Sequence, residues 1–498
     1  MLTFGTLVVV ALRADDAARL SPADWAAIRF TVLQASLSAL ISVALAVPVA
    51  RALARRRFPG RGLLVTLLGA PFLLPVIVAI LGLLAVFGQA GVLNALLEAL
   101  GVPTVRIYGL HGVVLAHVFF NLPLATRLIL QGWLAIPSER FRLAQSLGFS
   151  AADIQRHLEW PMLRGVLPGA FLVIFLICTT SFAVALTLGG GPRATTIELA
   201  IYQAFRFEFD LGKAALLGVL QFALGTTAAL MAFAVSRQMN TSAGLDRDPI
   251  RFGGASRVLV MVDAVAIAAV ALFLLTPLTM VVLNGAPMLL NLPEQVFAAL
   301  RRSLLVALLS TALTLTLALS MSLFIVRARF GVGVEALAYL SISASPLVVG
   351  TGLFILLFPI ADPIALALPV TALVNALMAL PFAVRSLVPA LSEIDANFGR
   401  LADSLALNGL SRFRVLVLPR IRRPLGFAAG LSAALSMGDL GVIALFADPN
   451  TATLPLQLYR LMGSYRMDEA AGAALLLLIA ALALFWVFDR GGRVNADL

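Results

Sequence analysis

The sequence predicts an all-α, polytopic membrane protein whose helices form two parallel, pseudo-symmetric halves. The chain has 498 residues, of which 61% are hydrophobic and only 12% are charged, and its mean hydropathy is +1.01. Soluble proteins carry about 25% charged residues. Runs of roughly 20 apolar residues recur along the chain, and each is long enough to cross the bilayer core as a helix.

Eleven apolar runs predict eleven membrane-spanning helices. We place them near 28–51, 62–88, 110–134, 165–188, 212–236, 257–283, 300–326, 335–359, 368–391, 424–447 and 470–488. A further run, Leu2–Leu12, has 11 residues and would measure only about 17 Å as a helix. We expect it to be the remnant of a first spanning helix or an interfacial segment, so the total is eleven or twelve.

An internal repeat relates the two halves of the chain. Residues 121–161 align without a gap with residues 379–419, at a constant offset of 258. Nearer the start of each half the offset is 272, which pairs Thr31 with Ser303. Parallel repeats predict a pseudo-two-fold axis along the membrane normal. We therefore divide the chain into a first half at 1–236, a polar linker at 237–257 and a second half at 258–498.

The distribution of charge predicts the orientation of the chain. All but one of the 36 basic residues are arginines, Lys213 being the only lysine. Most arginines fall in short loops on one side, which the positive-inside rule assigns to the cytoplasm. The opposite loops are poorer in arginine and contain acidic residues such as Glu198. The net charge of +11 therefore reflects topology and not nucleic-acid binding, and both termini are cytoplasmic if Leu2–Leu12 spans.

Two polar loops on the cytoplasmic side, 138–161 and 396–419, carry the most informative spacing. The first contains Ala144, Gly148, Leu158 and Pro161, and the second repeats these intervals with Ala402, Ala406, Leu416 and Pro419. Small residues allow a helix to lie close in a partner's groove, glycine permits a turn between short helices, and proline suits the start of the next helix. We expect short helices near 138–150 and 396–411.

This spacing is similar to the coupling loop of binding-protein-dependent ABC-importer permeases, which is written EAA-x3-G-x9-I-x-L-P. The resemblance implies that each loop fits a cleft on a separate ATPase subunit, so two loops imply two copies. Both loops have Arg-Leu in place of Glu-Ala. The second loop also has Ala406 at the glycine position, with Gly409 three residues later, so we expect its turn to be displaced.

The chain itself has no signature of an ATPase or a metalloprotein. A phosphate-binding loop requires G-x4-G-K-[ST], whereas Lys213 is followed by Ala214, and Phe207 occupies the first glycine position. One cysteine and three histidines do not form a metal-site pattern. We therefore expect no enzymatic activity, cofactor or metal in this chain, with ATP and Mg²⁺ bound by the partner ATPase.

Three segments, 108–130, 188–205 and 436–466, make the resemblance more specific. They look like the corresponding parts of thiamine importer permeases, and the likeness extends from about residue 25 to the C-terminus. It implies type I ABC-importer permease architecture, a multi-pass location in the bacterial inner membrane, a periplasmic substrate-binding protein as partner, and thiamine and its phosphates as substrates. The LGGGP sequence at 188–192 also resembles ferric-iron importer permeases, so ferric iron is the alternative substrate.

Asp439 is the candidate residue of the translocation pathway because it lies well inside an apolar segment. A carboxylate within the membrane is costly and indicates a function, here lowering the barrier for a cation such as thiamine. The alternative is a structural carboxylate that bonds to the nearby backbone or to Ser436, or that lies near the polar end of a broken helix beside Gly438 and Gly441. We also expect His117 and Asn375 to make interhelical hydrogen bonds, and Asp263 to pair with Arg257.

Two other classes of membrane protein are open to a chain of this composition. A secondary transporter can also have parallel repeats. It would need a set of buried ionisable residues for ion coupling, and Asp439 alone does not form such a set. A channel is disfavoured by the duplicated polar loop.

Overall fold

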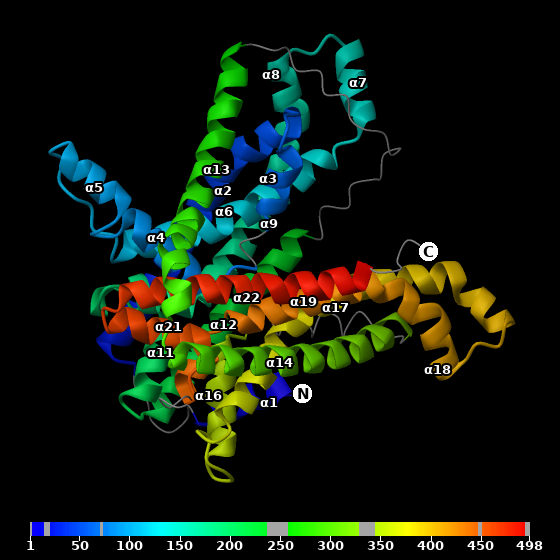
Figure 1. Ribbon diagram of the computed structural model, residues 1–498. Helices are drawn as coiled ribbons and strands as arrows, with labels where there is room; N and C mark the ends of the chain where they lie inside the picture. Colours follow the sequence, from blue (N-terminus) through cyan, green and yellow to red (C-terminus); the bar gives the residue numbers. More distant parts are fainter. Residues whose placement is uncertain are drawn as a thin grey trace.

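The computed structural model describes residues 2–13, 20–69, 73–236, 257–327, 344–446 and 451–493, and its regular elements there are helices (Figure 1). Within these ranges ten helices are long and apolar enough to cross a membrane. The prediction of an all-α, polytopic membrane protein is therefore confirmed.

The first half begins with two helices of very different length and ends with a long one. Its elements are α1 (Leu2–Arg13), α2 (Pro22–Arg55), α3 (Arg61–Leu67), α4 (Val76–Phe87), α5 (Val92–Ala99), α6 (Leu110–Leu134), α7 (Ser138–Ser146), α8 (Ala151–Ile154), a π-helical turn (Gln155–Glu159), α9 (Trp160–Thr179), α10 (Phe182–Leu188), α11 (Ile197–Arg206) and α12 (Leu211–Ser236).

The second half repeats most of this order. Its elements are α13 (Arg257–Gly285), α14 (Glu294–Arg327), α16 (Pro346–Leu357), α17 (Ala367–Ser404), α18 (Gly409–Arg412), a π-helical turn (Phe413–Val417), α19 (Leu418–Met437), α20 (Gly441–Phe446), α21 (Leu454–Gly463) and α22 (Met467–Arg493). Equivalent helices have equal lengths: α2 and α14 have 34 residues, α9 and α19 have 20, and α11 and α21 have 10.

The pseudo-symmetry extends to single hydrogen bonds. The Thr31 hydroxyl on α2 accepts from the backbone N–H of Ile197 at the start of α11, at 2.9 Å. The Ser303 hydroxyl on α14 accepts from the N–H of Leu454 at the start of α21, at 2.8 Å. The first N–H groups of a helix have no partner within the helix, so one side chain of a neighbouring long helix provides the missing acceptor in each half.

Several predicted spans differ from the observed helices. The span at 62–88 is split into α3 and α4, and the spans at 165–188 and 424–447 are each interrupted near their external ends. The interruptions lie at Thr180–Ser181, before α10, and at Gly438–Leu440, before α20. Only the part of 335–359 from residue 344 onwards is described, and α16 there has 12 residues. The linker at 237–256 lies outside the described residues, so the domain boundaries stay a prediction.

The first helix of each half packs against the other half. Helix α13 packs against α4 and α2 of the first half, and α1 packs against α16 of the second half. The expected pair between Asp263 and Arg257 is wrong for this reason. Because α13 runs beside the cytoplasmic end of α2, Asp263 lies instead 2.7 Å from Nε of Arg56.

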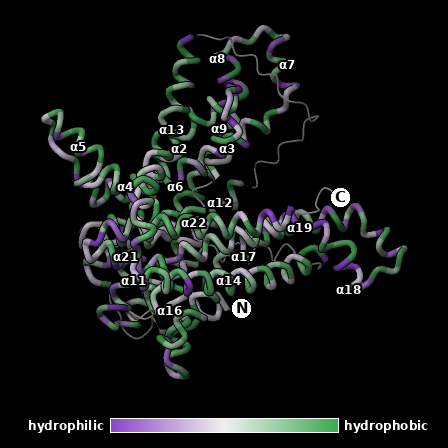
Figure 2. The backbone as a smooth tube through the Cα atoms, viewed as in Figure 1, coloured by the Kyte–Doolittle hydropathy of each residue, from purple (hydrophilic) through white to green (hydrophobic). Residues whose placement is uncertain are grey.

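The long helices form two arms that diverge from a shared base (Figure 1). One arm contains α2, α6, α9 and α13 and ends at α7 and α8, and the other contains α14, α17, α19 and α22 and ends at α18. The largest cluster of buried apolar side chains lies in the base and draws residues from both halves. Figure 2 shows apolar residues along the arms and polar residues concentrated near their ends, where the two polar loops lie.

We predict that Thr31→Val and Ser303→Ala each lower the stability of the protein. Each change leaves a buried backbone N–H without an acceptor, which costs about 1–3 kcal/mol. The measurement is thermal unfolding in detergent, with Thr316→Val as the control because Thr316 is exposed and bonds only within its own helix. Equal melting temperatures for Thr31→Val and the control would contradict the assignment.

Candidate functional site

The two polar loops fold alike despite their different sequences. In the first, the N–H of Phe149 bonds to the carbonyl of Ala144 at 2.9 Å, and in the second the N–H of Leu407 bonds to the carbonyl of Ala402 at 2.9 Å. This bond closes the end of a helix around a left-handed residue. That residue is Gly148 with φ +71° in the first loop and Ala406 with φ +50° in the second.

The turn of the second loop is therefore not displaced as expected. Ala406 adopts the left-handed conformation at the position of Gly148, at a steric cost of about 1–2 kcal/mol for a residue with a Cβ. Gly409 has φ +53° and starts α18, so it forms a second left-handed position and does not replace the first.

The first small residue of each motif does not lie on the exposed surface of its loop. Ala144 and Ala402 are buried within the chain, so their size serves packing inside the loop. The exposed residues beside them are two leucine pairs, spaced four residues apart on one helix face. Leu143 and Leu147 in the first loop and Leu401 and Leu405 in the second have exposed fractions of 55–63%. Sequence reasoning missed these pairs, although their i, i+4 spacing and offset of 258 were visible.

The later residues of the motif lie where each loop rejoins its arm. Pro161 and Pro419 lie in the first turn of α9 and α19, where they were expected, and each of these helices follows a π-helical turn without a break. Proline has no N–H to donate to the preceding turn, and a π turn accommodates such an interruption. Leu416 is buried and Leu158 is partly buried beside these turns.

Ion pairs fix each loop in its own way. Glu159, in the first π-helical turn, lies 2.8 Å from Arg55 at the end of α2. In the second loop, Arg412 lies 2.7 Å from Asp403 and 3.2 Å from Asp395. Each loop is thereby anchored to the rest of its arm, which allows a displacement of the loop to be transmitted to the arm.

A cavity of about 390 Å³ lies between the two halves, within the size range of small-molecule sites. Residues at equivalent positions of the repeat line it, among them His117 with Asn375 and Ser181 with Asp439. Each pair relates one residue of the first half to one of the second at an offset of 258, so both halves contribute equivalent positions to the cavity wall. Both interruptions, at Thr180–Ser181 and at Gly438–Leu440, line it.

Asp439 makes a backbone contact and also lines the cavity. Its Oδ1 accepts from the backbone N–H of Gly441 at 3.2 Å, at the start of α20. Its Oδ2 is buried, makes no hydrogen bond to the described residues and belongs to a residue of the cavity wall. The contact to Gly441 agrees with the structural alternative, and the pathway role stays a prediction.

The expected interhelical hydrogen bonds are confirmed. Asn375 donates to the Ser436 hydroxyl at 3.0 Å, from α17 to α19. His117 Nδ1 on α6 lies 3.4 Å from the Ser38 hydroxyl on α2, while its Nε2 is buried without a partner.

Glu198 is the cavity residue that sequence reasoning missed. It was assigned to the acidic external loops, yet it is fully buried on α11 and lines the cavity. Its Oε2 accepts from the Ser345 hydroxyl at 2.7 Å, and its Oε1 has no partner. Its apolar neighbours Ile197 and Leu199 were the available signal.

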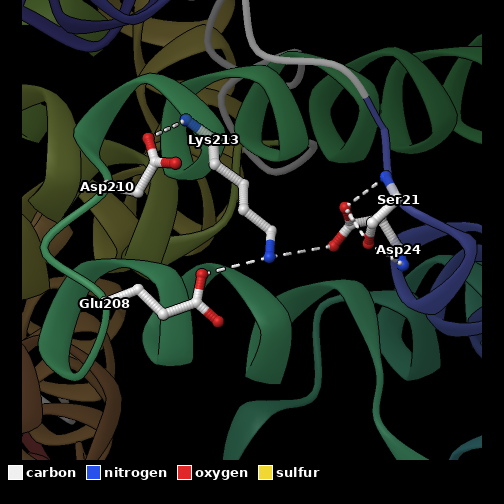
Figure 3. Close-up of polar contacts among 5 residues, drawn as sticks. All are labelled: Ser21, Asp24, Glu208, Asp210 and Lys213. Atoms are coloured by element: carbon white, nitrogen blue, oxygen red, sulfur yellow. Dashed lines mark hydrogen bonds and ion pairs between the residues drawn. The ribbon is translucent and has the colours of Figure 1, made fainter.

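The single lysine has a structural position on the external side. Lys213 lies 3.1 Å from Glu208 and 3.5 Å from Asp24, and Asp24 forms a capping box with Ser21 at the start of α2 (Figure 3). This cluster joins the starts of α2 and α12 on the side opposite to the polar loops. The position is consistent with the sequence argument that Lys213 is not part of a phosphate-binding loop.

No family model matches the chain, but curated relatives do. It is 40% identical over 510 aligned positions to a thiamine transport system permease protein of Brucella abortus, covering 100% of this chain and 94% of the relative. It is 39% identical to the protein of that name from Escherichia coli, over 95% of this chain and 90% of the relative. This chain belongs to the thiamine transport system permease family. A shorter likeness, 32% identity over 38% of the permease, relates it to a probable ABC transporter permease of Sinorhizobium fredii.

Family membership and the ten membrane-length helices identify the permease as a multi-pass inner-membrane protein. Among its described residues no group of three or more His, Cys, Asp or Glu side chains is arranged to hold a metal ion. The candidate functional features are the two leucine pairs at the arm ends and the polar atoms of the central cavity.

We predict that Gly148→Ala is tolerated at a cost of about 1 kcal/mol in stability. An added Cβ has open space around it, so the cost is only that of the left-handed backbone, which Ala406 already bears in the other loop. Thermal unfolding checks this, with Gly463→Ala as the control because Gly463 also has open space and lies in a helix. A loss of folded protein on Gly148→Ala would refute the equivalence of the two turns.

Proposed function

We propose that the permease is the membrane-spanning subunit of an ABC importer for thiamine, with its phosphates as further substrates. The observation that carries this proposal is the cavity between the halves, where carboxylate oxygens without partners suit a cation. The names of the two relatives with high coverage favour thiamine over ferric iron. Buried carboxylates repel phosphate, so we expect thiamine to be preferred to its phosphates.

The leucine pairs are the proposed docking points for two copies of a cytoplasmic ATPase subunit, which binds ATP and Mg²⁺. Two observations support this: the loops share one fold at equivalent positions, and each presents two exposed leucines in a polar setting. Exposed apolar pairs of this kind mark an interaction surface. A partner that binds both loops must itself be paired.

Alternating access follows from this arrangement. Closure of the ATPase dimer draws the arm ends together, and the anchored loops transmit the movement through α9 and α19 to the interrupted helices beside the cavity. A periplasmic substrate-binding protein delivers the substrate to the external side. A channel or an ion-coupled transporter has no need of two matched cytoplasmic docking loops.

We predict that replacing Leu143 and Leu147 together by serine weakens ATPase binding at least tenfold. Burial of one leucine is worth about 1.5–3 kcal/mol, and about 1.4 kcal/mol is tenfold in affinity. Replacing Leu401 and Leu405 together by serine should weaken ATPase binding by a similar factor. The measurement is the affinity of the purified ATPase for the permease in nanodiscs.

Leu290→Ser is the matched control, since Leu290 is highly exposed but lies between α13 and α14 at the opposite end of α14 from the polar loops. Unchanged ATPase affinity in either double variant would remove the leucine pairs from the docking surface.

We also predict that Asp439→Asn slows thiamine uptake by cells at least severalfold without lowering the amount of permease in the membrane. The change removes the charge that faces the cavity, while the amide oxygen can still accept from Gly441. Normal uptake at normal protein level would exclude Asp439 from the pathway.

A further inference from the structure

The burial of the Glu198 carboxyl group carries a desolvation penalty in this structure. Its side chain is fully buried, one carboxylate oxygen has a single hydroxyl donor, and the other has none. An ionised carboxylate removed from water carries a penalty of several kcal/mol unless it is paired. Burial of this kind in a membrane protein marks a functional group. No cationic side chain forms an ion pair with Glu198 in the described part of the chain, so the ionised form of Glu198 would need a counter-charge from outside these residues.

The surroundings of Glu198 point to the same cavity that contains Asp439. Glu198 comes from α11 of the first half, and Asp439 comes from the α19–α20 junction of the second half. Pro455 occupies the place of Glu198 on α21, and Ser181 occupies the place of Asp439. Each half therefore contributes one carboxylate, and the two are not copies of one repeated residue.

Three buried polar atoms without partners belong to residues of this one cavity. They are Glu198 Oε1, Asp439 Oδ2 and His117 Nε2. Buried polar groups in native structures are normally satisfied, so a cluster of three unsatisfied atoms indicates a ligand that supplies what is missing. Two carboxylate oxygens require positive charge or hydrogen-bond donors, and the volume of about 390 Å³ admits an organic cation.

We propose that Glu198 and Asp439 together form a cation-binding subsite in the central cavity, so that the permease itself selects positively charged substrates. The inference rests on the proposed function, because it assumes that the cavity lies on the substrate's path. Ser345 orients Glu198 from the second half by donating its hydroxyl to Oε2. The subsite is therefore complete only while the two halves are in contact at this bond.

The test is equilibrium binding of labelled thiamine to the permease–ATPase complex in nanodiscs, without the binding protein. Glu198→Gln is expected to weaken binding at least tenfold, and Glu198→Gln with Asp439→Asn further still. Glu198→Asp should retain part of the affinity. Glu294→Gln is the matched control, because Glu294 is exposed at the start of α14. A neutral analogue without the thiazolium charge should bind wild type and Glu198→Gln equally.

Ser345→Ala separates binding from a structural role. It removes both the donor to Glu198 and the cap of α16, where the Ser345 hydroxyl accepts from the N–H of Leu347. The carboxylate of Glu198 remains, so this variant should bind thiamine more tightly than Glu198→Gln does. If Ser345→Ala and Glu198→Gln lose stability and binding equally, Glu198 is structural and the subsite is overturned. Equal thiamine affinity in wild type and Glu198→Gln would also overturn it. An importer that takes up thiamine but whose permease complex binds none contradicts the subsite alone, whereas no thiamine uptake at all contradicts the proposed function.

Discussion

The interruption of two membrane helices is the constraint on which the rest of this structure depends. Helices α9 and α19 end inside the apolar region, and short helices α10 and α20 follow after breaks of two and three residues. Backbone groups freed by a break in the membrane must be satisfied within the protein or in a polar cavity. The breaks therefore create the polar cavity. Asp439 stabilises one of them by accepting a hydrogen bond from the backbone N–H of Gly441.

The two halves match at some positions of the repeat and differ at others. Where a residue supports a helix end, both halves keep a hydroxyl, as Thr31 and Ser303 do. Where residues face the cavity, the halves differ, as Asp439 and Ser181 do. Two halves with the same fold need the same hydrogen bonds at their helix ends. A small asymmetric ligand on the axis meets each half differently, so the residues around it have no reason to match.

The sequence predicted the helices, the repeat, the cytoplasmic side and the two polar loops, because these depend on local hydropathy and spacing. It missed the break before α10 because a continuous apolar run reads as one span whether or not the backbone is interrupted, and it raised a broken helix only beside Gly438 and Gly441. It placed Ala144 and Ala402 on the partner's side because burial within a loop depends on its fold. Glu198 was assigned to a loop because its burial arises from contact with α16 of the other half. The roles proposed for the loop residues and Asp439 stay predictions.

The most direct test of the account is uptake of labelled thiamine by proteoliposomes that contain the permease, its ATPase and its binding protein. The account predicts accumulation that requires ATP and the binding protein and is not driven by a proton or sodium gradient. Accumulation of ferric iron in place of thiamine would contradict the substrate. Thiamine uptake driven by an ion gradient without ATP would contradict the importer mechanism.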